Sequence, residues 1–152
     1  MPNEIRVRTA EVKDIDTIAE LNLAMAWETE QKRLTPATLR RGICAVLDDS
    51  DYGFYVVAEA EDQVVGCLMI TYEWSDWRNG RFWWIQSLYV RPQFRHRGVF
   101  KHLHDFVQAR AREHAEVCGI RLYVEQSNHI AQHAYRQIGM HPTTYQMYEE
   151  ML

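Results

Sequence analysis

Residues 93–106 read QFRHRGVFKHLHDF, and within them a basic stretch around a single glycine gives way to a helical pattern. Arg95, Arg97 and Lys101 surround Gly98, after which apolar residues recur at helical spacing. Cations at the first turn of a helix are unfavourable beside the positive end of the helix dipole, unless an anion binds there. Three interpretations follow: a solvated helix start, a nucleic-acid patch, or a cradle for a phosphate-bearing ligand.

The composition narrows these interpretations. The chain has 152 residues, of which 47% are hydrophobic and 25% are charged, which is typical of one globular domain over residues 1–152. Its net charge of −4 argues against a nucleic-acid partner. No apolar run approaches the roughly 20 residues that span a bilayer, and no secretory signal is present. We therefore expect no membrane partner and a cytoplasmic location.

The order of the elements predicts the fold class. The second half contains a strand–helix–strand unit, which implies a parallel pair of strands with a right-handed crossover. The expected fold is α/β, a single domain with a mixed, mostly antiparallel sheet, a central parallel strand pair and helices on both faces. The expected strands are residues 5–10, 54–60, 64–74, 81–90, 120–126 and 144–152, and the expected helices are 12–25, 36–47, 98–117 and about 129–138.

Two motifs resemble those of the GCN5-related N-acetyltransferase (GNAT) superfamily. The run Arg95-His96-Arg97-Gly98-Val99-Phe100 resembles the family's motif Q/R-x-x-G-x-G/A. The run NHIAQHAYRQIGM resembles a second family motif, with Asn128, Ala131, Tyr135 and Gly139 at the expected spacings. The order of elements upstream agrees with the family as well.

The resemblance implies a cosubstrate, acetyl-CoA, and a set of residues that bind it. The pyrophosphate would lie on backbone amides from Arg95 to Lys101, and the pantetheine arm would pair with the strand at Leu88, Tyr89 and Val90. Asn128 would hold the far end of the arm. Tyr135 would protonate the departing thiolate, and a phenol with a reference pKa of about 10 can do so at neutral pH. The full set of expected cofactor-binding residues is Leu88, Tyr89, Val90, Arg95, His96, Arg97, Gly98, Val99, Phe100, Lys101 and Asn128.

Two residues depart from the family's pattern. Phe100 stands where the family has glycine or alanine, and we expect its ring to point into the core from the first helical turn. Gln86 stands where many relatives have a glutamate that acts as general base, and glutamine cannot take up a proton at a useful pH. An alternative function is therefore a CoA-binding sensor or scaffold with little turnover.

Aromatic and acidic residues predict the acceptor site. Rings and carboxylates together suit a cation, so a primary amine would be drawn to Trp27, Glu28 and Glu30, in the connection between the first two helices, and to Glu73 and Trp84 on the strands. The amine could belong to a small molecule, a peptide lysine or a protein N-terminus. Alternatively, these aromatics form a packed hairpin or the contact of a homodimer.

Histidines raise the question of a metal site. His129 and His133 are four apart on one predicted helix, a spacing that can bind zinc, but no third ligand accompanies them. We therefore expect no metal.

Overall fold

The computed structural model describes residues 4–152, and contacts divide the chain into two compact units. The first unit ends at Leu122 and the second is Tyr123–Leu152. The first unit contains β1 (Arg6–Thr9), the 3₁₀ turn η1 (Val12–Asp14), α1 (Ile15–Glu30), α2 (Pro36–Asp48), β2 (Phe54–Ala60), β3 (Gln63–Ser75), β4 (Gly80–Val90), the 3₁₀ turn η2 (Pro92–Phe94), α3 (Val99–Arg112) and β5 (Val117–Arg121); the second contains α4 (His129–Gln137).

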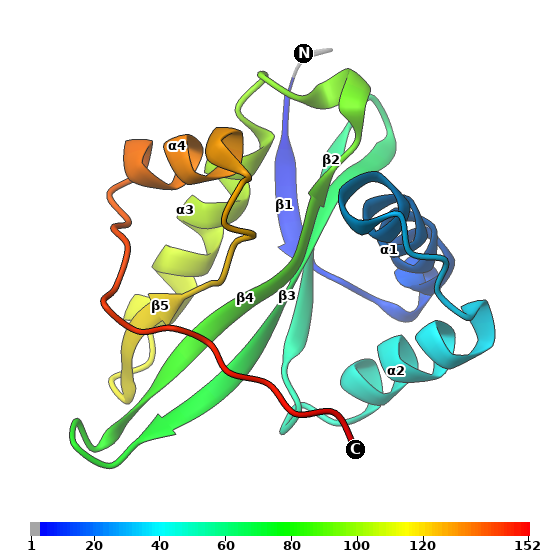
Figure 1. Ribbon diagram of the computed structural model, residues 1–152. Coiled ribbons are helices and arrows are strands. Elements are labelled where there is room, and N and C mark those ends of the chain that lie inside the picture. The colour runs from blue at the N-terminus through cyan, green and yellow to red at the C-terminus, as the bar shows by residue number, and fades with distance from the viewer. Residues whose placement is uncertain (1–3) are drawn as a thin grey trace. The chain divides into compact units, whose positions relative to one another are not determined.

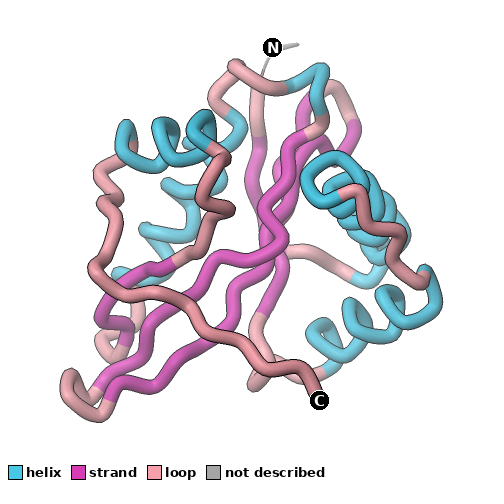
Figure 2. The backbone as a smooth tube through the Cα atoms, viewed as in Figure 1, coloured by secondary structure: helices cyan, strands magenta, loops and turns pink. Residues whose placement is uncertain are grey.

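The first unit is built on one mixed sheet with the strand order β1-β2-β3-β4-β5. Strands β1 to β4 pair antiparallel; short turns join β2 to β3 and β3 to β4, whereas α1 and α2 lie between β1 and β2 in the chain. β4 and β5 are parallel because α3 carries the chain back across the sheet. Figure 2 shows the strands as one continuous layer. The predicted mixed sheet and its parallel pair are confirmed.

Helices cover both faces of this sheet, as predicted. Figure 1 shows α3 on one face and α1 with α2 on the other. Leu103 and Val107 of α3 are fully buried against strand residues such as Ile85. On the opposite face, Ile18 of α1 and Ile43 of α2 are fully buried in a second apolar cluster.

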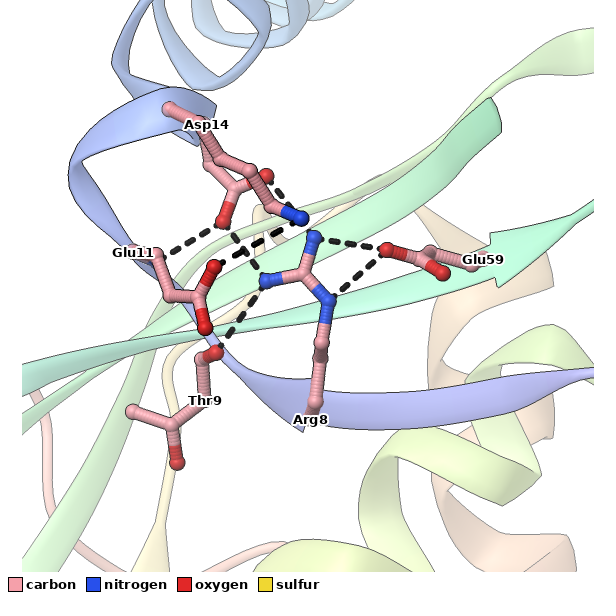
Figure 3. A network of polar contacts seen from close by, with 6 residues as sticks. Arg8, Thr9, Glu11, Asp14 and Glu59 are labelled. Atoms are coloured by element: carbon pink, nitrogen blue, oxygen red, sulfur yellow. Dashed lines mark hydrogen bonds and ion pairs between the residues drawn. The ribbon is translucent and has the colours of Figure 1, made fainter. Parts of the chain in front are cut away.

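A partly buried ion-pair network joins β1 to the start of α1. Arg8 donates to both carboxylate oxygens of Asp14, at 2.7 and 2.9 Å, and its Nε donates to Glu59 at 2.7 Å (Figure 3). Asp14 also accepts the backbone N–H of Glu11 at 2.7 Å. Burial raises the pKa of the Asp14 carboxyl, but the hydrogen bonds from Arg8 and Glu11 outweigh burial and leave that pKa below its ordinary value.

Four predicted elements have wrong bounds or are absent, and the first is the helix expected over 12–25, because α1 spans Ile15–Glu30. The helix expected over 98–117 ends at Arg112, and Gly119, expected as its cap, lies inside β5. A Cβ at Gly119 would lie 2.7 Å from the ring of Phe82, so glycine is needed there for close strand packing. β5 ends at Arg121, so the strand expected over 120–126 starts and stops too late. Residues 144–152, expected as a strand, form neither helix nor strand.

Candidate active site

The basic loop leads directly into α3 through two residues with left-handed backbone. His96 has a φ of 63° and Gly98 a φ of 81°, and Gly98 is the N-cap of α3. No side chain caps this helix, so the first amides of α3, from Val99 to Lys101, lack the partner that a serine or aspartate cap would supply. Uncapped amides at a helix start are donors suited to a phosphate.

Apolar contacts fix this helix start against the sheet. Val99 is buried, and a Cβ at Gly66 of β3 would lie 3.1 Å from Val99 Cγ1 and 3.1 Å from the Tyr89 carbonyl oxygen. Glycine at position 66 therefore allows α3 to begin very close to β3 and β4. Phe100 is half-buried, with its ring 6.3 Å from the ring of the buried His104.

Each cation of the basic loop pairs with a carboxylate of the chain. Arg97 lies 3.6 Å from Glu61 in the β2–β3 turn, and about half of each side chain is exposed. Lys101 pairs with Asp105 one helical turn later, at 2.8 Å. Arg95 lies 2.7 Å from Glu28, which is on α1. Sequence reasoning missed Glu61, because nothing in the order of residues brings this turn next to the loop.

β4 carries a bulge just before the predicted pantetheine strand. Cys67 pairs with Tyr89 and Met69 with Gln86, so the register shifts by one residue between them. Ser87 lies at the shift with a φ of 54°, a left-handed conformation that is uncommon for serine. The sequence gives no signal for it, because neither glycine nor asparagine marks the position.

The parallel strands separate beyond this point. β5 pairs with β4 only from Arg81 to Trp84, where Trp84 lies opposite Arg121. In the part of the chain that the structure describes, the rest of β4, including Leu88 to Val90, has no β5 partner. An open strand edge of this kind can accept an extended ligand through backbone hydrogen bonds.

A row of polar side chains follows one face of β3 and β4. Gln86 donates to Thr71 Oγ1 at 2.6 Å, and Trp84 Nε1 donates to Glu73 at 2.8 Å. Arg121 donates to the same Glu73 oxygen at 2.9 Å. The hydrogen bond from Trp84 has the largest effect and lowers the pKa of Glu73; burial opposes it and the hydrogen bond from Arg121 adds to it, so the pKa lies below its ordinary value. The sequence does not mark Arg121 as a site residue. It places Arg121 near the start of a strand expected to run to residue 126, whereas β5 ends at Arg121, beside Glu73.

The acidic and aromatic residues expected in a connection lie instead on α1. Trp27, Glu28 and Glu30 belong to its last turns, because the run preceding Gln31 contains no helix breaker; Gln31, with a φ of 52°, ends the helix. The guanidinium of Arg33 lies 4.4 Å from the centre of the Trp27 ring, and Glu30 is exposed. The five expected acceptor residues thus lie on three elements, with Trp27, Glu28 and Glu30 on α1, Glu73 on β3 and Trp84 on β4.

The second unit carries the two remaining predicted residues. Asn128 is the N-cap of α4, where its side chain accepts the Ala131 backbone N–H at 3.1 Å. Tyr135 lies on α4, and burial raises the pKa of its phenol above 10.0. The phenol is therefore protonated at neutral pH and able to donate.

Neither a metal cluster nor a membrane span emerges from the described residues. Between residues 4 and 152, no three His, Cys, Asp or Glu side chains are grouped so that they could hold a metal ion. In the same range, every helix is too short or too polar to cross a membrane.

Comparisons with known proteins identify a matching family model and similar solved structures. A sequence model of the Acetyltransferase (GNAT) family matches residues 13–140. A solved structure of a possible acetyltransferase from Clostridium difficile 630 is 42% identical, covers 97% of each chain and superposes with a TM-score of 0.90. No curated protein sequence matches the chain significantly.

More distant solved structures share the fold. A predicted acetyltransferase with acetyl-CoA from Clostridium acetobutylicum is 19% identical, with 97% of this chain and 96% of that chain covered and a TM-score of 0.79. The glucosamine-6-phosphate N-acetyltransferase of Arabidopsis thaliana is 18% identical, with 97% and 98% covered and a TM-score of 0.73.

Proposed function

Because the chain belongs to the GNAT family of acetyltransferases, we propose that this N-acetyltransferase moves the acetyl group of acetyl-CoA directly to a primary amine. The observation that carries the proposal is the uncapped start of α3 behind Gly98, with the open edge of β4 beside it. The first supplies donors for a pyrophosphate, and the second supplies a strand edge for the pantetheine arm.

The chemistry requires a neutral amine. Its nitrogen attacks the thioester carbonyl, and a C–N bond forms while the carbonyl oxygen becomes an oxyanion. A backbone amide near Leu88, beside the bulge at Ser87, would stabilise that oxyanion. The C–S bond then breaks, and Tyr135 gives its proton to the sulfur, which leaves as the CoA thiol.

The proton of the amine leaves without a carboxylate at position 86. Gln86 donates to Thr71, so this side chain is held as an amide donor on the sheet face. Water takes the amine proton in our proposal, and the tyrosinate left at position 135 recovers its proton from solvent. An alkyl amine has a pKa of about 10.4 and is mostly protonated at neutral pH. The rate of transfer therefore rises with pH as the neutral form of the amine accumulates.

The acceptor would approach along the face of β3 and β4 that carries Glu73 and Trp84. Arg121 already neutralises Glu73, so this face attracts a cationic amine less strongly than an unpaired carboxylate would. Trp27 and Glu30, at the end of α1, are the other proposed acceptor contacts. The face suits a small amine or an extended peptide bearing a lysine or a free N-terminus.

The test is acetyl transfer to a panel of small amines and peptides, together with calorimetry of acetyl-CoA binding. Wild-type protein should bind acetyl-CoA and acetylate at least one amine. Arg97→Glu should weaken binding about tenfold to hundredfold, because it reverses a charge beside the expected pyrophosphate. Binding without turnover on any acceptor would favour a CoA sensor, and unchanged affinity in Arg97→Glu would contradict the placement.

A further inference from the structure

Glu28 connects the end of α1 to the end of β4. Its Oε2 accepts the hydroxyl of Tyr89 at 2.8 Å, and its Oε1 lies 2.7 Å from Nη1 of Arg95. Both carboxylate oxygens are therefore used by residues that belong to the expected acetyl-CoA site. An acceptor amine that met Glu28 would have to share this carboxylate with Tyr89 and Arg95.

Arg95 is held from three sides. Besides pairing with Glu28, its Nε donates to the carbonyl oxygen of Val90 at 3.0 Å. Its guanidinium carbon lies 5.3 Å from the centre of the Tyr89 ring. The first cation of the basic loop therefore binds back to the strand. Arg97 and Lys101 form more exposed ion pairs, which a pyrophosphate could replace more readily.

The charge state of this cluster is fixed at neutral pH. The hydrogen bond from Arg95 holds the pKa of Glu28 below its ordinary value; burial opposes this, and the hydrogen bond from Tyr89 adds to it. Burial, and then the contact with Glu28, raises the pKa of Tyr89, so the phenol keeps its proton and donates. A charged carboxylate thus holds a cation and a phenol together.

We propose that Glu28 is a positioning residue for acetyl-CoA, which acts through Arg95 and Tyr89 to fix the end of β4 and the entry to the basic loop. The inference rests on the proposed function. It assigns Glu28 to the cosubstrate site, whereas Trp27 and Glu30 remain proposed acceptor contacts. Glu28 needs no contact with acetyl-CoA for this role, because it sets the backbone that does the binding.

The same helix offers a matched control. Glu20, about two turns earlier on α1, pairs with Arg91 at 2.9 Å, and Arg91 Nε donates to the Val64 carbonyl oxygen at 2.9 Å. This arrangement repeats that of Glu28 and Arg95, but it lies before η2 and is more exposed on the glutamate side, at 63% against 40%. Glu20→Gln therefore removes an equivalent ion pair without touching the loop entry.

The experiment compares Glu28→Gln with Glu20→Gln by calorimetry of acetyl-CoA and by steady-state kinetics. Glu28→Gln should weaken acetyl-CoA binding about tenfold, since hydrogen bonds to charged groups contribute at that level. The KM for acetyl-CoA should rise in parallel, while the KM for the amine and kcat at saturation change less than about twofold. Glu20→Gln should stay within about twofold of wild type throughout.

A double-mutant cycle with Arg95→Gln tests whether Glu28 acts through Arg95. If it does, the double variant binds acetyl-CoA at most about threefold more weakly than Arg95→Gln alone, which is the loss expected through Tyr89. If Glu28→Gln does not fold, Tyr89→Phe removes one donor but keeps the ring, and a loss of about threefold in affinity is expected.

The outcomes separate this inference from the proposed function. Equal affinities for the two glutamine variants, additive losses in the cycle, or a rise confined to the amine KM would each overturn the role of Glu28 alone. Wild-type protein that binds no acetyl-CoA would overturn the proposed function and this inference with it.

Discussion

At the scale of single residues, Tyr135 is the group expected to act on the reacting atoms. Tyr135→Phe keeps the ring and removes the proton, so kcat should fall about 10²-fold while acetyl-CoA affinity stays within about twofold. Tyr145→Phe, which alters a 73% exposed tyrosine of the same unit, is the control and should change neither. Steady-state assays measure kcat, and calorimetry measures the affinity for acetyl-CoA.

The pH profile offers a second check on Tyr135. Burial raises the pKa of Tyr135 above its ordinary value, so the phenol keeps its proton while the fraction of neutral amine grows toward pH 10. Turnover should therefore rise from pH 7 toward 10 and decline only above the ordinary tyrosine range. A decline that begins below pH 9 would assign the acid to another group.

A substitution of Glu61 should change the affinity for acetyl-CoA in the direction opposite to Arg97→Glu. Glu61 pairs with Arg97 at 3.6 Å and so competes with any phosphate for that cation. Glu61→Gln should tighten acetyl-CoA binding about twofold to threefold at low salt, with the gain shrinking as salt screens the charges. Asp62→Asn removes a charge from the same turn without breaking this ion pair, and its effect should be smaller. Weaker binding in Glu61→Gln would show that the pair orders the loop instead.

At the scale of secondary-structure elements, the close approach of α3 to the sheet depends on Gly66. An added Cβ would meet the Tyr89 carbonyl oxygen and Val99 Cγ1, each at 3.1 Å, so Gly66→Ala should lower the free energy of unfolding by about 1–3 kcal/mol. Gly42→Ala is the matched control in α2, where a Cβ meets nothing within 4 Å. It should raise the free energy of unfolding by about 0.5–1 kcal/mol, because alanine favours a helix interior. Urea denaturation of both variants would distinguish the two signs.

Most elements could be predicted from the sequence because their signals are local. Thr35 before Pro36 marks the start of α2, and Asn79-Gly80 marks the β3–β4 turn. The end of α3 could not be predicted, because residues 113–121 contain no breaker before Gly119 and the pairing of β5 with β4 decides where the strand begins.

Some features of the candidate site could likewise be predicted from the sequence, and others could not. Gly98 and the cations around it could be predicted from spacing, since backbone amides and charge at a helix start follow from the chain itself. The bulge at Ser87 and the contact of Glu28 with Arg95 could not be predicted. Both arise from pairing between elements far apart in the sequence. Neither Ser87 nor Glu28 is a residue type that signals such a contact in advance.

At the scale of the whole molecule, Asp14 links the fold's stability to pH. Its pKa lies below the ordinary value, so its ion pair with Arg8 stabilises the protein above about pH 4 and is lost as the pH falls through the lowered pKa. Asp14→Asn should cost about 1–3 kcal/mol of unfolding free energy at pH 7, and the difference from wild type should shrink below pH 4.

Asp16 provides the control for that measurement. It pairs with Arg40 at the surface, where 83% of its side chain is exposed. Asp16→Asn should cost less than about 1 kcal/mol at pH 7. Both variants are measured by denaturant unfolding at pH 7 and pH 3. Equal losses of unfolding free energy would show that the network of Figure 3 stabilises the protein no more than a surface ion pair does.

The paired arginines after β4 have a mechanical consequence for α1. Glu20 and Glu28 hold Arg91 and Arg95 from points about two turns, or about 12 Å, apart on the helix. A rod attached at one point can pivot, whereas a rod attached at two points transmits any displacement to the segment it is joined to. Residues 91–95 are therefore restrained in orientation as well as in position relative to α1, mostly through Glu28, whose carboxylate is less exposed than that of Glu20, because exposed ion pairs contribute little.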